Sequence, residues 1–452
     1  MKKMAFSWWG LASLCAMIVS CNNPDSVEED DELPTKDSDT GPDLDLSRCA
    51  YGTGEYHNYF LDSGFTEEEV DDRIDTAWSL LFEGDPASET VYYEAGTNDD
   101  GPMAYIEDIA NEDVRSEGMS YGMMIALQLD KQARFDALWN WAKTHMWHGS
   151  NAHPFYEYFA WNVHPDGEAH DDTPAPDGEE YFAMALYFAS GRWGDGKGIY
   201  DYRAEADRLV SAMRHREDIH GWYMDRGNRA QDVGFAIVHP QYKMVRFVPK
   251  ATYGTTSQGD HTDPSYHLPG FYQLWSVFGP EEDRTFWNLV ADVSRDYFET
   301  VAHPETALTP DYAHYNGEPA AASWNENTAK FGPDACRTVM NWSMDWAWFC
   351  VDEREQERSD KLQRFFASLG EPYDAKYELD GTPLENNYYS PSVVAMNATS
   401  VLAATDDARS ASFVEALWNL EVPSGRYRYY DGMLYMFALL HVSGRFRIYE
   451  PA

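Results

Sequence analysis

The amino-acid sequence predicts an all-α protein whose helices form an (α/α)6 barrel, and three observations support this. Apolar residues recur at helical spacing in about twelve segments, whereas alternating strand patterns are few. Gly-, Pro- and Asp-rich loops separate these segments, and no linker or change of composition follows residue 49. A solenoid of stacked repeats would show a fixed period, and none is visible. Twelve helices in one domain are therefore expected to pair as an inner and an outer layer.

The expected helices follow one another from residue 66 to residue 443. Thr66 and Glu69 match a capping box, and the helix that they start has an apolar face formed by Val70, Ile74, Ala77 and Leu81. The same spacing predicts further helices near residues 117–130, 132–146, 178–190, 202–215, 265–278, 281–299, 335–350, 354–369, 391–404, 407–418 and 432–443.

The first residues are typical of a targeting segment. Lys2 and Lys3 precede an apolar run over 4–19 that is too short for a comfortable membrane span. The run ends in Ile-Val-Ser-Cys, which resembles a bacterial lipobox. We therefore expect residues 1–21 to be a lipoprotein-type signal peptide and Cys21 to carry a lipid that anchors the exported protein to a bacterial membrane, in the periplasm or at the cell surface. An ordinary signal peptide with an incidental cysteine is the alternative.

An acidic segment over 22–48 follows, with ten acids against Lys36 and Arg48. It lacks the apolar residues needed to fold, so we expect a flexible tether. Residues 49–452 are expected to form a single folded domain. The whole chain carries 34 basic and 77 acidic residues, a net charge of −43. Such a surface repels nucleic acid. Hydrophobic residues at 43% exclude global disorder, and we expect a monomer.

Three cysteines remain in the expected domain: Cys49, Cys336 and Cys350. Their number is odd and their spacing fits no metal site, so we expect no metal ion. Export would permit a disulfide, but three cysteines in a domain of this length do not make a disulfide scaffold. Reduced, buried thiols are the expected state.

One predicted helix carries a polar stripe on an otherwise apolar surface. At 100° per residue, Asp334, Arg337, Asn341 and Asp345 fall within one narrow sector. Such groups need partners inside the protein. Two interpretations stay open: a structural ladder in which Asp334 pairs with Arg337, or a functional stripe that faces the barrel centre.

Three further clusters place polar residues where helices begin. Glu117 lies beside two glycines, and the helix dipole would lower its pKa unless burial outweighs it. Asp177 and Glu180 match an N-cap with its reciprocal Glu. Asp263 could cap the next helix, and a lone His267 is more often a hydrogen-bonding residue than a catalyst.

Together these clusters resemble glycoside hydrolase family 8, in particular its xylan-acting members, from about residue 51 to residue 450. The matching segments are Ser-Glu-Gly-Met-Ser-Tyr-Gly-Met (116–123), Pro-Ala-Pro-Asp-Gly-Glu-Glu-Tyr-Phe (174–182), Asp-Pro-Ser-Tyr-His (263–267), Asp-Ala-Cys-Arg (334–337) and Tyr-Arg-Tyr-Tyr-Asp-Gly-Met-Leu-Tyr (427–435). The resemblance implies an (α/α)6 barrel with an open groove, and inverting hydrolysis without cofactor or metal.

The resemblance also implies roles for single residues. Glu117 would be the general acid and Asp334 the general base. Asp177 would hold the sugar at the cleavage point, and Tyr266 would touch that sugar or the water. Arg337 would bind at the same place and keep the Asp334 carboxylate ionised and oriented. Inversion needs an acid and a base about 6.5–9.5 Å apart, in surroundings that separate their pKa values.

Aromatic residues could stack on sugars in such a groove, although core packing is the default for each of them. The candidates are Trp161, Tyr429 and Tyr430. Within the family, segments 92–94 and 303–308 resemble the reducing-end xylose-releasing exo-oligoxylanases.

One departure from those enzymes concerns the end of the groove. They carry a Leu-His-Pro whose His binds the reducing-end sugar, whereas this chain has Tyr389-Ser390-Pro391. We expect hydrolysis of β-1,4-xylosidic bonds in xylo-oligosaccharides with release of xylose from the reducing end. An endo-1,4-β-xylanase acting on polymeric xylan is the alternative. A family 8 enzyme for another β-1,4-glucan or chitosan, or a non-catalytic glycan-binding lipoprotein, is less favoured.

Overall fold

The inner layer of the barrel is a ring of helices with hardly any exposed surface. Among the described residues it contains α4 (Ser116–Gln128), α6 (Pro176–Trp193), α8 (Pro269–Phe278), α10 (Arg337–Phe349), α12 (Pro391–Thr399) and α14 (Arg428–Val442). Contacts run from α8 through α10, α12 and α14 to α4 and α6. Nearly every residue of α4 and α12 is buried, as expected for helices that are apolar on all sides.

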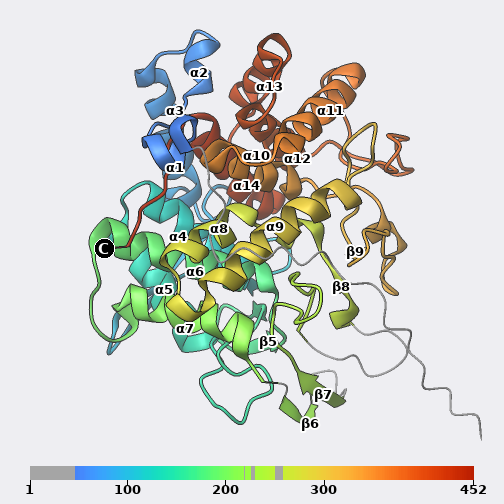
Figure 1. Ribbon diagram of the computed structural model, residues 1–452. Helices are drawn as coiled ribbons and strands as arrows, with labels where there is room; N and C mark the ends of the chain where they lie inside the picture. Colours follow the sequence, from blue (N-terminus) through green and yellow to red (C-terminus); the bar gives the residue numbers. More distant parts are fainter. Residues whose placement is uncertain (1–45, 218, 225–229, 250–257, 452) are drawn as a thin grey trace, which may run out of the picture. The chain divides into compact units, whose positions relative to one another are not determined.

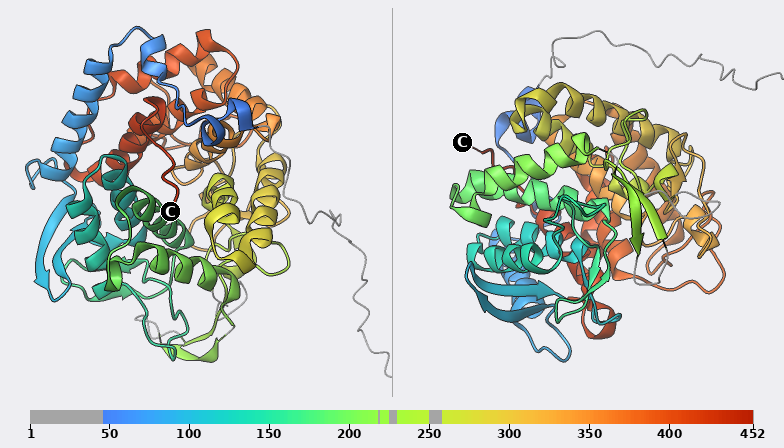
Figure 2. Two further views of the ribbon diagram at one scale, coloured as in Figure 1. Left: turned by 60° about the vertical axis from the view of Figure 1, so that its left-hand side comes forward. Right: turned by 90° about the horizontal axis from the view of Figure 1, so that it is seen from below.

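Each inner helix packs against one helix of the outer layer. Its helices are α3 (Glu67–Glu83), α5 (Gln132–His145), α7 (Tyr202–His215), α9 (Arg284–Val301), α11 (Glu353–Leu369) and α13 (Asp407–Asn419). Contacts join α4 to α5, α6 to α7, α8 to α9, α10 to α11, α12 to α13 and α14 to α3. Helix α3 buries one face only, whereas α5 buries all six residues from Ala137 to Ala142. The two layers are visible in Figures 1 and 2. The predicted (α/α)6 barrel is confirmed.

The computed structural model describes residues 46–217, 219–224, 230–249 and 258–451. The contacts divide the chain into Met1–Gly41 and Pro42–Ala452, and the second unit holds every described element. The expected signal peptide over 1–21, Cys21 and the tether up to residue 45 lie outside the described residues. The described remainder of the tether, Leu46–Arg48, forms a 3₁₀ turn. No helix in the described ranges combines the length and hydropathy that a bilayer span requires.

Most helix boundaries lie within three residues of the expected ones, and α14 begins at Arg428 rather than near residue 432. Three further differences stand out. Prolines divide the segment over 265–278, because Pro264 opens a 3₁₀ turn and Pro269 opens α8. The segment over 391–404 ends in the 3₁₀ turn Ser400–Leu402. Helix α10 begins at Arg337, so Asp334 lies in the preceding turn.

Short strands and turns fill the loops. The pairs are β1 (Tyr92–Asn98) with β2 (Gly101–Ile106), β3 (Val114–Arg115) with β4 (Asn162–Val163) and β5 (Ala169–Asp171), β6 (Ile219–Met224) with β7 (Ala230–Gly234), and β8 (His261–Thr262) with β9 (Ala313–His314). All pairs are antiparallel, and Arg115 pairs with Asn162 directly before α4. The other short helices and turns are α1 (Ala50–Thr53), α2 (Tyr59–Asp62), Gly198–Tyr200, Gln258–Asp260, Glu281–Asp283, Glu326–Ala329 and Gly425–Tyr427.

Candidate active site

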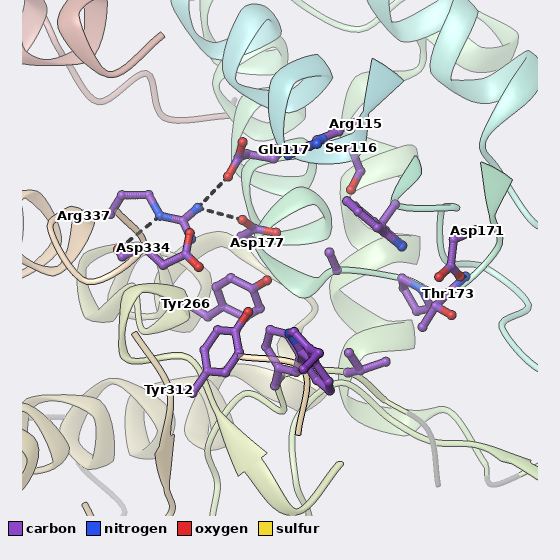
Figure 3. Close-up of a pocket in the computed structure, with 16 residues that line it drawn as sticks. Arg115, Ser116, Glu117, Asp171, Thr173, Asp177, Tyr266, Tyr312, Asp334 and Arg337 are labelled. Carbon is purple, nitrogen blue, oxygen red and sulfur yellow. Dashed lines mark hydrogen bonds and ion pairs between the residues drawn. The ribbon is translucent and has the colours of Figure 1, made fainter. Parts of the chain in front are cut away.

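Two adjoining cavities lie at the end of the barrel where the inner helices begin. One has a volume of about 390 Å³ and the other about 850 Å³, and both are lined by Arg115, Glu117 and Asp334. The remaining lining residues come largely from the first turns of the inner helices and the loops before them. Glu117 and Asp334 therefore lie where one cavity meets the next, and Figure 3 shows both among the residues that line the smaller cavity.

The Arg337 side chain lies at the centre of this site and is only 3% exposed. Its Nη1 donates to Glu117 Oε2 at 2.8 Å, to Asp177 Oδ2 at 2.9 Å and to the Tyr121 hydroxyl at 3.0 Å. Its Nη2 donates to Asp334 Oδ1 at 3.4 Å. One guanidinium thus connects three carboxylates from three parts of the barrel (Figure 3).

The expected pairing of Arg337 with Asp334 exists at 3.4 Å, but it is longer than the contacts with Glu117 and Asp177. The Arg337 side chain reaches past Asp334 to α4 and α6, where these two residues lie. We therefore revise the expectation that Arg337 acts mainly on Asp334: its closest acidic partners are Glu117 and Asp177.

The polar stripe of α10 serves two purposes along its length. Asn341 donates to the backbone oxygens of Ser265 and His267 at 2.7 and 3.1 Å. Asp345 forms two hydrogen bonds with Arg295 of α9 at 2.7 and 2.9 Å. The beginning of the stripe lines the cavities and the rest joins helices, so each of the two interpretations holds for part of the helix.

Glu117 occupies the first turn of α4 and keeps 15% of its side chain exposed. Burial raises its pKa above the usual range, against the opposing effects of Arg337, Tyr429 and Arg115. The Tyr429 hydroxyl donates to Glu117 Oε1 at 2.8 Å. A Cβ atom at Gly118 would lie 2.5 Å from the Tyr429 ring, so the glycine permits this approach. Burial thus shifts the pKa of Glu117 in the direction that a proton donor needs.

Asp177 lies in the first turn of α6, but it is not the helix cap. Ala175 is the N-cap residue and Pro176 follows it, so the expected capping pair is wrong. The Glu180 carboxylate instead accepts a hydrogen bond from the Tyr272 hydroxyl. Burial raises the pKa of Asp177 to about 7, although Arg337 opposes this.

Two hydrogen bonds hold the turn that presents Asp334. The Ala335 amide donates to Asp311 Oδ1 at 2.9 Å, and the Tyr430 hydroxyl donates to the Pro333 oxygen at 2.8 Å. The Asp334 side chain is 36% exposed, so water reaches it. Arg337 contacts Glu117 Oε2 at 2.8 Å and Asp334 Oδ1 at 3.4 Å, so one guanidinium brings together the two carboxyl groups that are expected to act as acid and base.

Aromatic rings line both cavities. Tyr266 and Trp161 line the smaller one, where the Arg337 guanidinium lies 5.8 Å from the Tyr266 ring centre. Trp324, which is 57% exposed, lines it as well, and sequence analysis missed it. Tyr430 lines the larger cavity. No local pattern distinguishes Trp324, because its exposure depends on the folded loops around it.

Asp263 and His267 have structural contacts that explain them. Asp263 Oδ1 accepts from the Ser265 amide at 2.7 Å, which is the expected cap. His267 is fully buried between the Thr262 and Ser294 hydroxyls at 3.0 Å each, and burial lowers its pKa to about 3. The prediction that His267 is a hydrogen-bonding residue is confirmed. The Asp263 carboxylate also lies 3.6 Å from Arg337 Nη2.

Comparison with known proteins identifies the family. The sequence model described as "Glycosyl hydrolases family 8" matches residues 97–444. The chain belongs to glycoside hydrolase family 8. A family 8 xylobiose complex from Teredinibacter turnerae, a solved structure, is 50% identical, with a TM-score of 0.85 over 89% of this chain and 100% of that one. The family assignment makes the protein a glycoside hydrolase.

Two curated relatives show the range of family 8 proteins that resemble this chain. The reducing-end xylose-releasing exo-oligoxylanase Rex8A of Paenibacillus barcinonensis is 41% identical over 401 residues, which cover 88% of this chain and 98% of that protein. Endoglucanase A of Acetivibrio thermocellus is 28% identical over 345 residues, covering 74% of this chain and 63% of that protein.

Proposed function

We propose that this family 8 enzyme hydrolyses β-1,4-xylosidic bonds of xylo-oligosaccharides with inversion and releases xylose from the reducing end. The observation that carries the proposal is the set of three carboxyl groups around Arg337 where two aromatic-lined cavities meet. The likeness to Rex8A over nearly the whole of both chains supports the substrate.

In the proposed reaction Glu117 is the general acid and Asp334 the general base. Burial raises the pKa of Glu117 and so favours its protonated form, which gives its proton to the glycosidic oxygen as the bond to the anomeric carbon breaks. Asp334 takes a proton from water, whose oxygen bonds to the same carbon from the opposite face. Asp177 and Tyr266 hold the sugar that is attacked.

A second candidate function is cleavage inside longer xylan chains. The larger cavity extends beyond both acids, and Ser390, a small residue, lines it. The Ser390 hydroxyl is engaged with Asp431 Oδ1 at 3.2 Å. A family 8 xylanase from Teredinibacter turnerae that is 50% identical was solved with xylohexaose bound. The lining of the larger cavity and the xylohexaose complex favour internal cleavage, whereas the likeness to Rex8A favours release of xylose from the reducing end.

Product analysis distinguishes these functions. The enzyme is incubated with xylotetraose and with polymeric xylan, each labelled at the reducing end, and early products are separated. Labelled xylose alone supports release from the reducing end, a spread of labelled oligomers supports internal cleavage, and no cleavage of either substrate overturns the proposal. Proton NMR of the new anomeric centre tests inversion, because an initial β-product contradicts it. Glu117→Gln is the inactive control.

We also propose that residues 1–21 direct export, that Cys21 is lipidated and that residues 22–48 tether a monomeric domain to the membrane. The lipobox-like Ile-Val-Ser-Cys and the acidic composition of the tether support this. Labelling with a radioactive fatty acid should mark the wild-type chain and leave Cys21→Ala unmarked. Light scattering of the released domain measures its oligomeric state, and a dimer mass would contradict the monomer.

A further inference from the structure

Two cysteines meet at the end of the barrel opposite the cavities. Cys350 caps the C-terminal end of α10, whereas the candidate active site lies at the beginning of the same helix. Cys49 immediately precedes α1, at the start of the described domain, and is 1% exposed. The Cys350 side chain is hydrogen-bonded to that of Cys49, so the two cysteines are neighbours across the boundary between α1 and α10.

The surrounding contacts fix the two cysteines in this position. Helix α1 packs against α10. The rings of Tyr51 and Phe349 lie 5.3 Å apart, and each ring is within two residues of one of the cysteines. The Thr53 amide and hydroxyl both donate to the Cys49 oxygen, at 3.0 and 2.9 Å. The backbones on both sides are therefore held independently of the sulfur atoms.

We propose that Cys49 and Cys350 form a disulfide that joins the start of the domain to the end of α10 once the protein meets a disulfide oxidant, such as a protein dithiol oxidase or oxidised glutathione. The Cys350 thiolate attacks the oxidant disulfide and releases one of its thiolates. The Cys49 thiolate then attacks the mixed disulfide at the Cys350 sulfur and releases the second. Two cysteine thiols are oxidised, one oxidant disulfide is reduced, and the two released thiolates take up the two protons.

Accessibility determines this order of attack. Cys350 is partly exposed and lines a cavity of about 210 Å³, together with Arg48 and Ala50, whereas Cys49 is buried. Burial and the neighbouring Cys49 raise the pKa of the Cys350 thiol to about 12. Because only the thiolate reacts, the oxidation is slow at neutral pH and accelerates as the pH rises.

Cys336 is excluded from this pairing by its position. It lies directly before α10, roughly 20 Å from Cys350 at 1.5 Å per helical residue. Its thiol donates to the Pro333 oxygen at 3.0 Å. The proposal thus predicts one specific pair among the three cysteines of the domain.

Peptide mapping tests the pairing, because trypsin places the three cysteines on separate peptides: 49–73, 331–337 and 338–354. The full chain is purified under reducing conditions, incubated with oxidised glutathione at mildly alkaline pH, alkylated and digested. We expect peptide 49–73 linked to peptide 338–354, with peptide 331–337 alkylated. Alkylation of all three peptides, or a link to 331–337, overturns the proposal.

Variants and thermal unfolding complete the test. Cys49→Ser and Cys350→Ser should each abolish the link, and the matched Cys336→Ser should keep it. The link closes a loop of about 300 residues in the unfolded chain, so the oxidised wild type should unfold roughly 2–5 °C above the reduced form. Cys350→Ser should show no such difference. An equal Tm for both forms of the wild type would overturn the stabilising role of the link.

Discussion

Replacing Tyr429 with Phe removes one hydrogen bond to the proposed general acid and little else. The Tyr429 ring is 2% exposed and keeps its packing in the variant, but Glu117 Oε1 loses the donor at 2.8 Å. That donor favours the ionised carboxylate and so lowers the pKa of Glu117. Without it, the pKa of Glu117 should rise further above its usual range.

The size of the effect follows from the strength of this bond. A hydrogen bond to a charged group is worth about 1.5–3 kcal/mol when buried, and one pKa unit corresponds to about 1.4 kcal/mol. Because Glu117 is partly exposed, water replaces some of the lost interaction, and we expect a rise of roughly 0.5–1 unit. The catalytically competent form is the protonated one, and activity is lost as pH rises through this pKa. The basic limb of the profile should therefore move to higher pH.

The assay is the pH dependence of kcat/KM for xylotetraose, compared between the wild type and Tyr429→Phe. Tyr430→Phe is the matched control, because the Tyr430 hydroxyl bonds to the Pro333 oxygen and not to Glu117. Its basic limb should stay in place. The wild type must first show a well-defined basic limb. If the basic limb of Tyr429→Phe then lies at the same pH or at a lower pH, Glu117 is not the acid whose ionisation limits the reaction.

Four further predictions concern the same site. Glu117→Gln and Asp334→Asn should each lower kcat by about 10²–10⁴-fold while the Tm stays within a few degrees, and a variant that keeps a tenth of the activity would refute its assignment. Burial raises the pKa of Asp177 to about 7 and of Glu179 to about 8, so the folded state holds more protons than the unfolded state above pH 4. The free energy of unfolding should fall as pH rises from about 4 to 8, and urea titrations that show a rise would contradict this. Arg337→Met should cost about 3–5 kcal/mol near neutral pH, because it leaves buried carboxylates unpaired, and a smaller loss at pH 5 is expected in the same titrations. EDTA should leave the rate unchanged, and a loss that added metal ions restore would reveal a metal requirement.

Helices were predictable here because local spacing determines which face of a helix is buried. The run from Val70 to Leu81 shows the pattern that its packing requires, and the capping box of Thr66 and Glu69 is present. The helical pattern and its cap depend on residues close together in the chain, which is why sequence alone indicated them. The division of the segment over 265–278 was not predicted, although Pro264 and Pro269 mark it.

The site was only partly predictable, because its contacts join distant residues. Arg337 and Glu117 are 220 positions apart, and their spacing in the sequence contains no sign that they meet. Resemblance to a known family selected Glu117, Asp177 and Asp334. Local reasoning took Asp177 for a helix cap, since a Glu three residues later imitates a capping pair. Asp and Glu occur both in capping motifs and in catalytic sites, so the spacing of Asp177 and Glu180 alone does not distinguish the two roles.

Both ends of the described chain lie on the side of the barrel away from the groove. Cys49 meets the end of α10, and the Ile448 amide donates to the Tyr56 hydroxyl at 2.9 Å nearby. This arrangement suits the enzyme to immobilisation. A support or fusion partner attached close to Leu46 or Pro451 would lie on the side of the barrel away from the two cavities, so a carbohydrate could reach the cavities without passing the point of attachment.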